Sequence, residues 1–125
     1  MYLLDTNTVI YFCNSKLSEK ARNLLFDISP AISVITNIEL FASSKIPQKE
    51  KATLEAFVSA STVYDHIDIS IVASAISIRQ QYNTKLPDAI IAATALAYNL
   101  KLITYNISDF KNVEGLQLID PFDIW

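Results

Sequence analysis

The chain has 125 residues, of which 51% are hydrophobic and 18% are charged, so it can fold around its own core without disulfides. One cysteine, Cys13, and one histidine, His66, exclude a disulfide framework and a Cys/His zinc site. The single glycine excludes glycine-rich phosphate loops, and the net charge of -3 is unusual for a nucleic-acid-binding protein.

Apolar runs alternate with helix-capping residues along the chain. Residues 2–4 form a short apolar run that indicates a buried strand, and Asp5 can cap the helix that follows. Ser70 can cap a segment in which apolar side chains recur every three or four residues, as is typical of a helix. The predicted strands are residues 2–4, 31–35, 62–64, 101–104 and 116–119. The predicted helices lie between Asp5 and Cys13, between Ser18 and about Phe26, at 36–43 and 48–60, from Ser70 to Tyr82, and from Pro87 to about Leu100.

This alternation of strands and helices predicts an α/β fold. Right-handed crossovers between successive strands produce a parallel sheet that is covered by helices on both faces. We therefore expect a three-layer α/β/α sandwich with a central, mainly parallel sheet, formed by residues 1–125 as a single domain. No basic segment precedes an apolar run at the N-terminus, and residues 89–98 are too few to span a bilayer, so we expect a cytoplasmic protein without membrane contact.

Acidic side chains follow three of the predicted strands. Asp5 follows the first strand, Glu39 lies in the helical turn after the second, and Asn106 and Asp109 follow the fourth. Ligand sites of parallel sheets form beyond the carboxyl ends of the strands, so we expect these side chains to converge. Asp88 lies in the first turn of a helix whose N-terminus can face the same edge.

Each of these acids also has a local explanation. Thr36 and Glu39 have the spacing of a capping box, and Asn106 and Asp109 have a similar pattern. The other two acids suit helix N-termini, where negative charge is favourable and a cap is worth about 1 kcal/mol. Capping alone, however, does not require that acids from several segments face one crevice.

Converging carboxylates need a cation. Two of them about 5 Å apart repel by roughly 3 kcal/mol at an effective dielectric of 20, which exceeds the gain from a cap. Oxygen-only ligands favour Mg²⁺ or Mn²⁺. Such ions bind phosphate and lower the pKa of water, so the pattern predicts phosphodiester hydrolysis.

Four segments, in this order and spread over nearly the whole chain, carry a family resemblance. They are LLDTN at 3–7, TNIEL at 36–40, LPDAIIAATAL at 86–96 and LITYNISDF at 102–110. Together they resemble the PIN-domain nucleases, and most closely the VapC-type toxins of toxin-antitoxin pairs. The resemblance implies a ribonuclease that holds one or two Mg²⁺ or Mn²⁺ ions with Asp5, Glu39, Asp88 and Asp109. It also implies supporting polar contacts to metal ligands or phosphate from Asn7, Thr104 and Asn106.

The resemblance further implies a homodimer, an RNA substrate such as tRNA, and a cognate antitoxin whose segment fills the acidic groove. Position 105 is tyrosine, where many relatives carry a basic residue, so contacts to RNA at this strand end are expected to differ. Phosphate contacts can also come from scattered basic residues: Lys45, Lys49, Lys51, Arg79, Lys85 and Lys101.

Three other functions remain open at this stage. The chain could be a catalytically silent module that binds RNA or protein, or a housekeeping RNA-processing nuclease. It could also be a phosphatase or phosphotransfer domain with Asp5 as the nucleophile. That chemistry usually needs a second aspartate two residues on or a lysine after a later strand, whereas here Asn7 follows Asp5 and Lys101 precedes its strand.

Overall fold

The structure of the chain is a computed structural model that describes residues 1–14 and 19–123, apart from the side chains of residues 21 and 25. The described residues form a five-stranded sheet in the order β3-β2-β1-β4-β5, and every pair of neighbouring strands is parallel. The strands are β1 (Tyr2–Leu4), β2 (Ala31–Ser33), β3 (Thr62–Tyr64), β4 (Lys101–Ile103) and β5 (Leu118–Ile119). The predicted parallel sheet is therefore confirmed.

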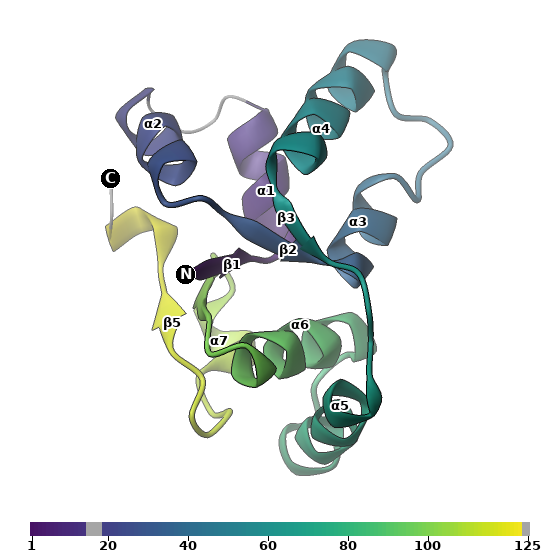
Figure 1. The fold of residues 1–125 in the computed structure, drawn as a ribbon, viewed down its shortest axis with the longest axis vertical. Helices are drawn as coiled ribbons and strands as arrows, with labels where there is room; N and C mark the ends of the chain where they lie inside the picture. The colour runs from purple at the N-terminus through teal and green to yellow at the C-terminus, as the bar shows by residue number, and fades with distance from the viewer. Residues whose placement is uncertain (15–18, 124–125) are drawn as a thin grey trace.

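Helices connect the strands and cover both faces of the sheet (Figure 1). They are α1 (Thr6–Cys13), α2 (Glu19–Asp27), α3 (Val34–Leu40), α4 (Gln48–Ala60), α5 (Ile69–Tyr82), α6 (Leu86–Ala97), α7 (Ile107–Phe110) and the short 3₁₀ helix η1 (Pro121–Asp123). In Figure 1, α1 to α4 lie above the sheet, whereas α5, α6 and α7 lie below it. This is the three-layer α/β/α sandwich that the sequence predicts.

Two hydrophobic cores lie on opposite faces of the sheet because successive strand residues point to opposite sides. Leu3 and Leu102 belong to the core beneath α5 and α6, and the next residues, Leu4 and Ile103, belong to the core beneath α1 and α4. All four are completely buried. The central strands β1 and β4 are thus apolar on both faces, as expected for a covered parallel sheet.

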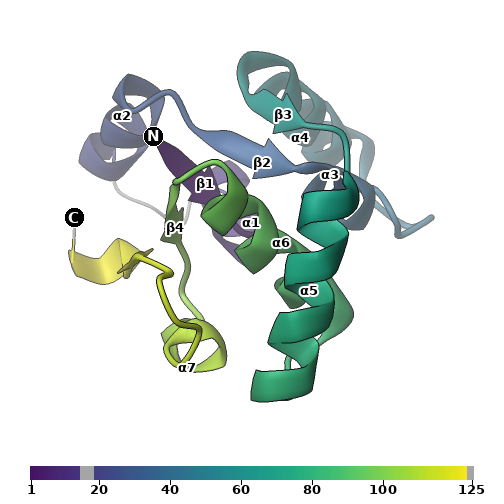
Figure 2. The same cartoon turned by 60° about the horizontal axis from the view of Figure 1, so that its bottom comes forward.

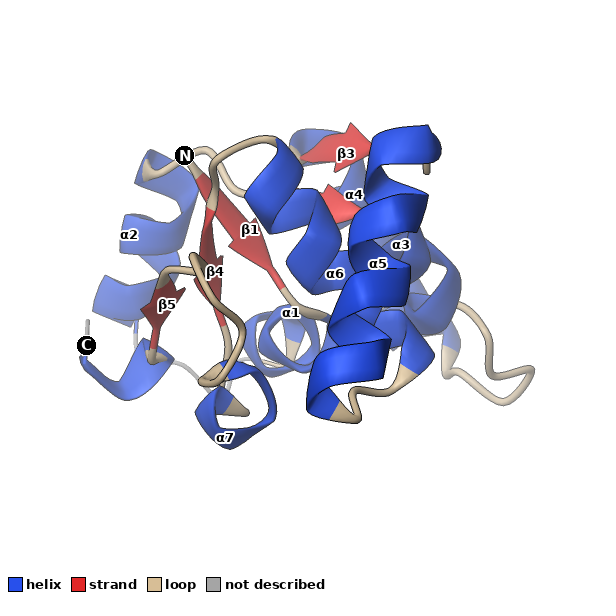
Figure 3. Ribbon diagram, turned by 90° about the horizontal axis from the view of Figure 1, so that it is seen from below, coloured by secondary structure: helices blue, strands red, loops and turns tan. Residues whose placement is uncertain are grey.

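The α5 and α6 helices pack side by side on one face, as Figure 3 shows. The predicted apolar stripe of α5 is confirmed, since Ile71, Ala75 and Ile78 are all buried. Its cap differs from the prediction, because Asp68 rather than Ser70 caps the helix by accepting a hydrogen bond from the backbone N–H of Ile71 at 2.9 Å.

Other element boundaries differ from the predictions as well. The β5 strand begins at Leu118 rather than at residue 116, and α3 ends at Leu40 rather than at residue 43. The second strand ends at Ser33, and α3 begins at Val34, because the Ser33 hydroxyl accepts a hydrogen bond from the backbone N–H of Ile35 at 3.2 Å and caps the helix. The α6 helix ends at Ala97 rather than near Leu100. Ser18, expected to begin the second helix, lies outside the described residues.

The carboxyl ends of the strands are the edge from which α1, α3 and α7 start. A functional site of this fold is expected at that edge. Within residues 1–14 and 19–123, none of the helices has the length and apolar character needed to cross a membrane.

Candidate active site

Asp5 is the most deeply buried acid at the carboxyl edge of the sheet, with 3% of its surface exposed. It is the N-cap of α1, and its Oδ1 accepts a hydrogen bond from the backbone N–H of Thr8 at 3.0 Å. Its Oδ2 accepts a hydrogen bond from the Thr104 hydroxyl at 2.5 Å. The helix cap considered for Asp5 is confirmed, and the same side chain is the one predicted for the acidic site.

The Thr104 hydroxyl is itself oriented by the chain that follows it. Thr104 is completely buried, and its Oγ1 accepts a hydrogen bond from the backbone N–H of Asn106 at 2.9 Å. With that acceptor position filled, the hydroxyl proton is directed at Asp5. Asn106 therefore supports the site through its backbone, and its side chain makes no capping hydrogen bond to α7, contrary to the local cap considered above.

Glu39 is held by the first turn of α1. Its Oε1 accepts a hydrogen bond from the Thr6 hydroxyl at 2.7 Å, and Thr6 Oγ1 also lies 3.1 Å from the hydroxyl of Thr36. A hydroxyl has one proton, so with the Thr6 proton on the carboxylate the Thr36 hydroxyl acts as the other donor. The capping box predicted for Thr36 and Glu39 is wrong, because Ser33 caps α3 and Thr36 is buried inside the helix.

Asp88 lies in the first turn of α6, half-buried, as the sequence predicts. Burial, and after it the negative charges of Asp109, Asp5 and Glu39, raise the pKa of Asp88 to about 6, whereas the Lys85 ammonium opposes the shift. The other three predicted acids therefore all act on Asp88. This electrostatic coupling means that the structure brings all four acids to the same edge.

The four carboxylates differ in their exposure to solvent. Asp5 is buried, Asp88 is half-buried, and Glu39 and Asp109 are exposed. Burial raises the pKa of Asp5, hydrogen bonds from Thr104 and Thr8 oppose the shift, and the Glu39 charge adds to it. The cluster thus has a protected inner end at Asp5 and an open outer side.

These side chains fit a hard divalent cation by their chemistry. All of their donor atoms are oxygens, and the mutual repulsion that raises the pKa of Asp88 is what a bound cation would relieve. Among residues 1–14 and 19–123, no group of three or more histidine, cysteine, aspartate or glutamate side chains is arranged to hold a metal ion. An open arrangement suits Mg²⁺, which usually keeps several waters and binds one or two carboxylates together with substrate phosphate.

The other residues that were predicted to contact phosphate or the metal ligands do not all lie at the carboxylate cluster. Asn7 is exposed on the first turn of α1. Lys85 lies close enough to Asp88 to lower its pKa, whereas Lys101 lies at the amino end of β4 and stacks over the ring of Tyr2 at 6.0 Å, on the opposite edge of the sheet. Lys101 cannot contact a phosphate at the carboxylate cluster.

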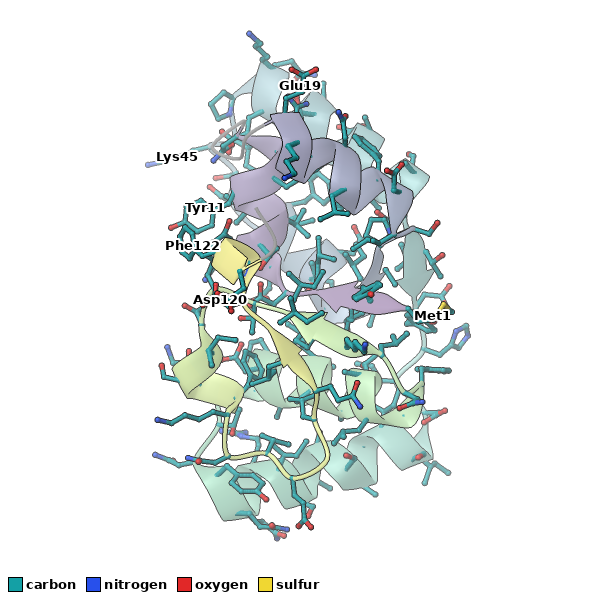
Figure 4. The ribbon with its side chains drawn as sticks, turned by 90° about the vertical axis from the view of Figure 1, so that its left-hand side faces the viewer. Met1, Tyr11, Glu19, Lys45, Asp120 and Phe122 are labelled. Carbon is teal, nitrogen blue, oxygen red and sulfur yellow. The ribbon has the colours of Figure 1, made fainter. Side chains whose placement is uncertain are left out.

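Tyr105 lies in a row of three aromatic rings next to the site. Its ring centroid is 4.7 Å from that of Tyr11 and 4.8 Å from that of Phe122, both in edge-to-face geometry. Figure 4 shows Tyr11 and Phe122 beside one another, on the opposite side of the molecule from Met1. Burial raises the pKa of Tyr105 to about 12, so its hydroxyl stays protonated and cannot act as a general base at neutral pH.

Sequence reasoning missed the threonines that hold the acids. Thr6 and Thr36 orient Glu39, and Thr8 supports Asp5 with its N–H while its own hydroxyl donates to the carbonyl of Ile103 at 3.2 Å. Their only sequence signal is a polar residue in the first turn after a strand. A threonine there is also an ordinary helix-start residue, so the signal does not identify a partner.

Covalent catalysis at this edge is disfavoured by the geometry. Each oxygen of Asp5 accepts one hydrogen bond and keeps a second lone pair that a cation can use, but with 3% of its surface exposed the side chain is not open to attack a phosphorus atom. Burial also raises the pKa of Cys13 to about 11, and this thiol packs against the hydrophobic core beneath α1 and α4. The phosphotransfer alternative therefore lacks an accessible nucleophile at Asp5.

Comparison with known proteins agrees with this geometry. The PIN domain family matches residues 2–116. A toxin-antitoxin complex from Klebsiella pneumoniae has a chain with 31% sequence identity and a TM-score of 0.77, covering 97% of this chain and 98% of that one. DNA-bound VapBC from Salmonella typhimurium has 28% identity and a TM-score of 0.84, covering 96% and 97%.

VapBC2 from Rickettsia felis, bound to a DNA fragment from its promoter, has 29% identity and a TM-score of 0.80, covering 94% of this chain and 96% of that one. No curated protein matches the chain significantly in sequence. The family match spans β1 to β4 and the segments that carry Asp5, Glu39, Asp88 and Asp109. The chain therefore belongs to the PIN domain family, and within it resembles the VapC-type toxins of toxin-antitoxin pairs.

Proposed function

We propose that the chain is a Mg²⁺- or Mn²⁺-dependent endoribonuclease that hydrolyses RNA phosphodiester bonds, and that it is the toxin of a toxin-antitoxin pair. The observation that carries this proposal is the electrostatic coupling of Asp88 to Asp109, Asp5 and Glu39. Asp88 therefore interacts electrostatically with acids from three other segments at the carboxyl edge of the sheet. Membership of the PIN domain family supports the nuclease activity.

In this proposal the four acids hold one or two divalent ions, which supply a nucleophilic water and neutralise charge on the phosphate. Thr104 and Thr8 orient Asp5, and Thr6 orients Glu39. Asn7 and Asn106 contact the phosphate or the metal ligands from the open side. Pre-oriented ligands favour catalysis because little reorganisation is needed when substrate arrives.

The toxin role is supported by the similarity to VapBC complexes. We infer that a cognate antitoxin inhibits the enzyme with a segment that fills the acidic groove, where a basic side chain would be attracted by the same carboxylates that bind the metal. The RNA substrate, of which tRNA is one candidate, places the activity in the cytoplasm. Residues 1–125 act as one nuclease domain, which the single sheet from residue 2 to residue 119 supports.

A homodimer is part of the same proposal. The outer face of α5 exposes Ile69, Val72 and Ile76 to solvent by 88%, 44% and 53%. Their spacing of three and four residues makes a continuous apolar stripe, and α5 is the outermost helix of its layer (Figure 1). Apolar stripes of this kind commonly mark protein interfaces.

The decisive experiment is RNA cleavage by the purified protein with Mg²⁺ or Mn²⁺, with EDTA, and as the Asp5→Asn variant. Asparagine caps a helix about as well as aspartate, so the variant is expected to fold. Asp65→Asn, an exposed acid that pairs with His66 away from the site, is the matched control. We expect cleavage by the wild-type and Asp65→Asn proteins that requires metal, and none by Asp5→Asn.

Cleavage that survives both EDTA and Asp5→Asn would refute the carboxylate-metal mechanism. RNA binding without any metal-dependent cleavage would favour the catalytically silent module. Inhibition by the co-expressed product of a neighbouring open reading frame would identify the antitoxin, whereas the lack of such a partner would favour the housekeeping nuclease.

A further inference from the structure

A polar cavity of about 220 Å³ adjoins the carboxylate cluster on the side of Asp88 and Asp109, which both line it. The rest of its wall comes from the turn between α5 and α6 and from residues in and just after α7. Figure 2 shows this turn and α7 at the same end of the molecule. The cavity is therefore continuous with the proposed active site, shares Asp88 and Asp109 with it, and extends beyond it between these two segments.

The turn between α5 and α6 is held in place by backbone conformation and by one arginine. Asn83 ends α5 in the left-handed conformation, with φ of 51° and ψ of 41°, which asparagine adopts more readily than most residues. The Nε of Arg79 donates a hydrogen bond to the carbonyl oxygen of Thr84 at 3.1 Å. These two features fix Thr84 in the wall of the cavity.

Thr84 carries an unusual polar group. Only 7% of its surface is exposed, and its Oγ1 is buried without a hydrogen-bond partner among the described residues. The large majority of buried side-chain polar atoms in native proteins have such a partner. The hydroxyl lies just behind the surface of the cavity, so a ligand can supply the missing hydrogen bond once the Thr84 side chain rotates toward the cavity.

The charges around the cavity restrict what that ligand can be. Asp88 and Asp109 are anionic, and Lys85 is the lining residue of opposite charge, so a phosphate is repelled unless it lies over a metal ion. The other polar lining residues, which include Asn83, Ser108 and Asn112, are neutral. Amide and hydroxyl groups match the hydrogen-bonding edges of a nucleobase and the hydroxyls of ribose.

The size of the cavity agrees with a single unit of RNA. Pockets for drug-sized ligands measure roughly 300–1,000 Å³, and this cavity of about 220 Å³ is smaller. It therefore fits one nucleoside rather than a folded RNA element. An RNA strand whose phosphate lies over Asp88 and Asp109 would place a neighbouring nucleoside at the mouth of the cavity.

We propose that this cavity binds the nucleoside next to the scissile phosphate and thereby determines which phosphodiester bond is cut. The inference rests on the proposed ribonuclease function and extends it by assigning a specificity site. Thr84 and Asn112 contribute hydrogen bonds to the base or the ribose, and no bond-making step is assigned to them.

The test is a titration of the protein in EDTA with adenosine, guanosine, cytidine and uridine, followed by NMR of the backbone amides. At least one nucleoside should give saturable shifts at residues 83–85 and 108–113. Thr84→Val and Asn112→Ala should each weaken binding by about 3- to 10-fold, the loss expected from one neutral hydrogen bond. Thr94→Val, which removes a buried hydroxyl bonded to the Ile90 carbonyl, is the matched control and should bind like the wild type.

Thermal unfolding separates a lost contact from a damaged fold. Because the Thr84 hydroxyl has no partner in the described residues, Thr84→Val should unfold at a temperature no lower than the wild type while binding nucleoside more weakly. In RNA cleavage, the same variant should raise KM or move the cleavage position with little change in kcat.

No saturable shift with any nucleoside, or equal binding by the wild type and both cavity variants, overturns the inference. If RNA is cleaved in that case, the proposed ribonuclease function stands without this site. If nucleosides bind at the cavity and RNA is not cleaved, the site stands and the proposed function fails.

Discussion

The hydroxyl of Thr104 donates a hydrogen bond to Oδ2 of Asp5 at 2.5 Å, although the two residues are 99 positions apart in the chain. Thr104 is completely buried and Asp5 is 3% exposed, so water does not compete for this bond. It joins the carboxyl ends of β1 and β4, the two central strands. The orientation of the innermost acid is therefore set by the sheet itself.

Thr104→Val is expected to destabilise the protein by about 1–3 kcal/mol, because a buried carboxylate oxygen loses its donor. RNA cleavage should fall by up to about 100-fold, since Asp5 is no longer held in place. Thr104→Ser keeps the hydroxyl and should therefore retain most of the stability and most of the cleavage activity. Urea unfolding and initial cleavage rates measure the two effects, and a valine variant with wild-type activity would remove Thr104 from the site.

Thr6→Val should affect activity more than stability. The hydrogen bond from Thr6 to Glu39 at 2.7 Å lies at an exposed position, so its loss changes the free energy of unfolding little but leaves Glu39 free to rotate. We expect cleavage to fall by about 3- to 10-fold. Thr6→Ser should retain activity, and Thr53→Val, which removes an exposed hydroxyl bonded within α4, should have no effect. Equal loss in Thr6→Val and Thr53→Val would refute a specific role for Thr6.

The raised pKa of Asp88, about 6, predicts how stability depends on pH without metal. The folded state binds this proton more tightly than the unfolded state, whose aspartate pKa is about 3.9. The free energy of unfolding should therefore fall as pH rises from about 4 to about 6. Asp88→Asn should weaken this dependence and give a higher Tm than the wild type at neutral pH in EDTA.

Added Mg²⁺ should reverse the trend for the wild-type protein, because the ion binds the deprotonated carboxylate. The Mg²⁺-induced rise in Tm should be larger above pH 6 than below pH 5, and smaller in Asp88→Asn. Thermal unfolding across this pH range, with Mg²⁺ or with EDTA, provides the measurement. Identical metal responses at both ends of the range would argue against Asp88 as a ligand.

The apolar stripe on α5 predicts that a charge there prevents dimer formation. Val72→Lys and Ile76→Glu should convert the homodimer to a monomer, because each places a charge in the proposed interface. Gln81→Glu, also exposed on α5 but on a different side of the helix from the stripe, should leave the dimer intact. Sedimentation equilibrium distinguishes the two states. A wild-type protein that is monomeric at high concentration would contradict the dimer.

The parallel sheet and the positions of the acids after strands or at a helix start could be predicted because both depend on short local patterns. A short apolar run followed by Asp5, or a helix that begins near Asp88, is visible within a few residues. The end of β2 could not be predicted in the same way, because the β-branched residues Val34 and Ile35 favour a strand. The Ser33 hydroxyl instead starts a helix there, so one capping hydrogen bond outweighs their propensity.

The supporting contacts were harder to predict because they join distant parts of the chain. Thr6 lies 33 residues from Glu39, and no local pattern links them. Thr84 has an ordinary sequence context, and its importance comes only from the burial of its hydroxyl in a cavity that also includes residues after α7. Long-range contacts of this kind depend on the packing of whole elements, which the sequence pattern predicts only in outline.

The 99-residue separation between Asp5 and Thr104 also bears on how a cell can make such an enzyme safely. A ribosome synthesises the chain from the N-terminus, so Asp5 emerges long before the strand that holds it. Until β4 has been made and inserted beside β1, the innermost carboxylate has neither its hydrogen-bond donor nor the neighbouring acid Asp109. A partly synthesised chain that lacks β4 therefore cannot assemble the proposed cutting site.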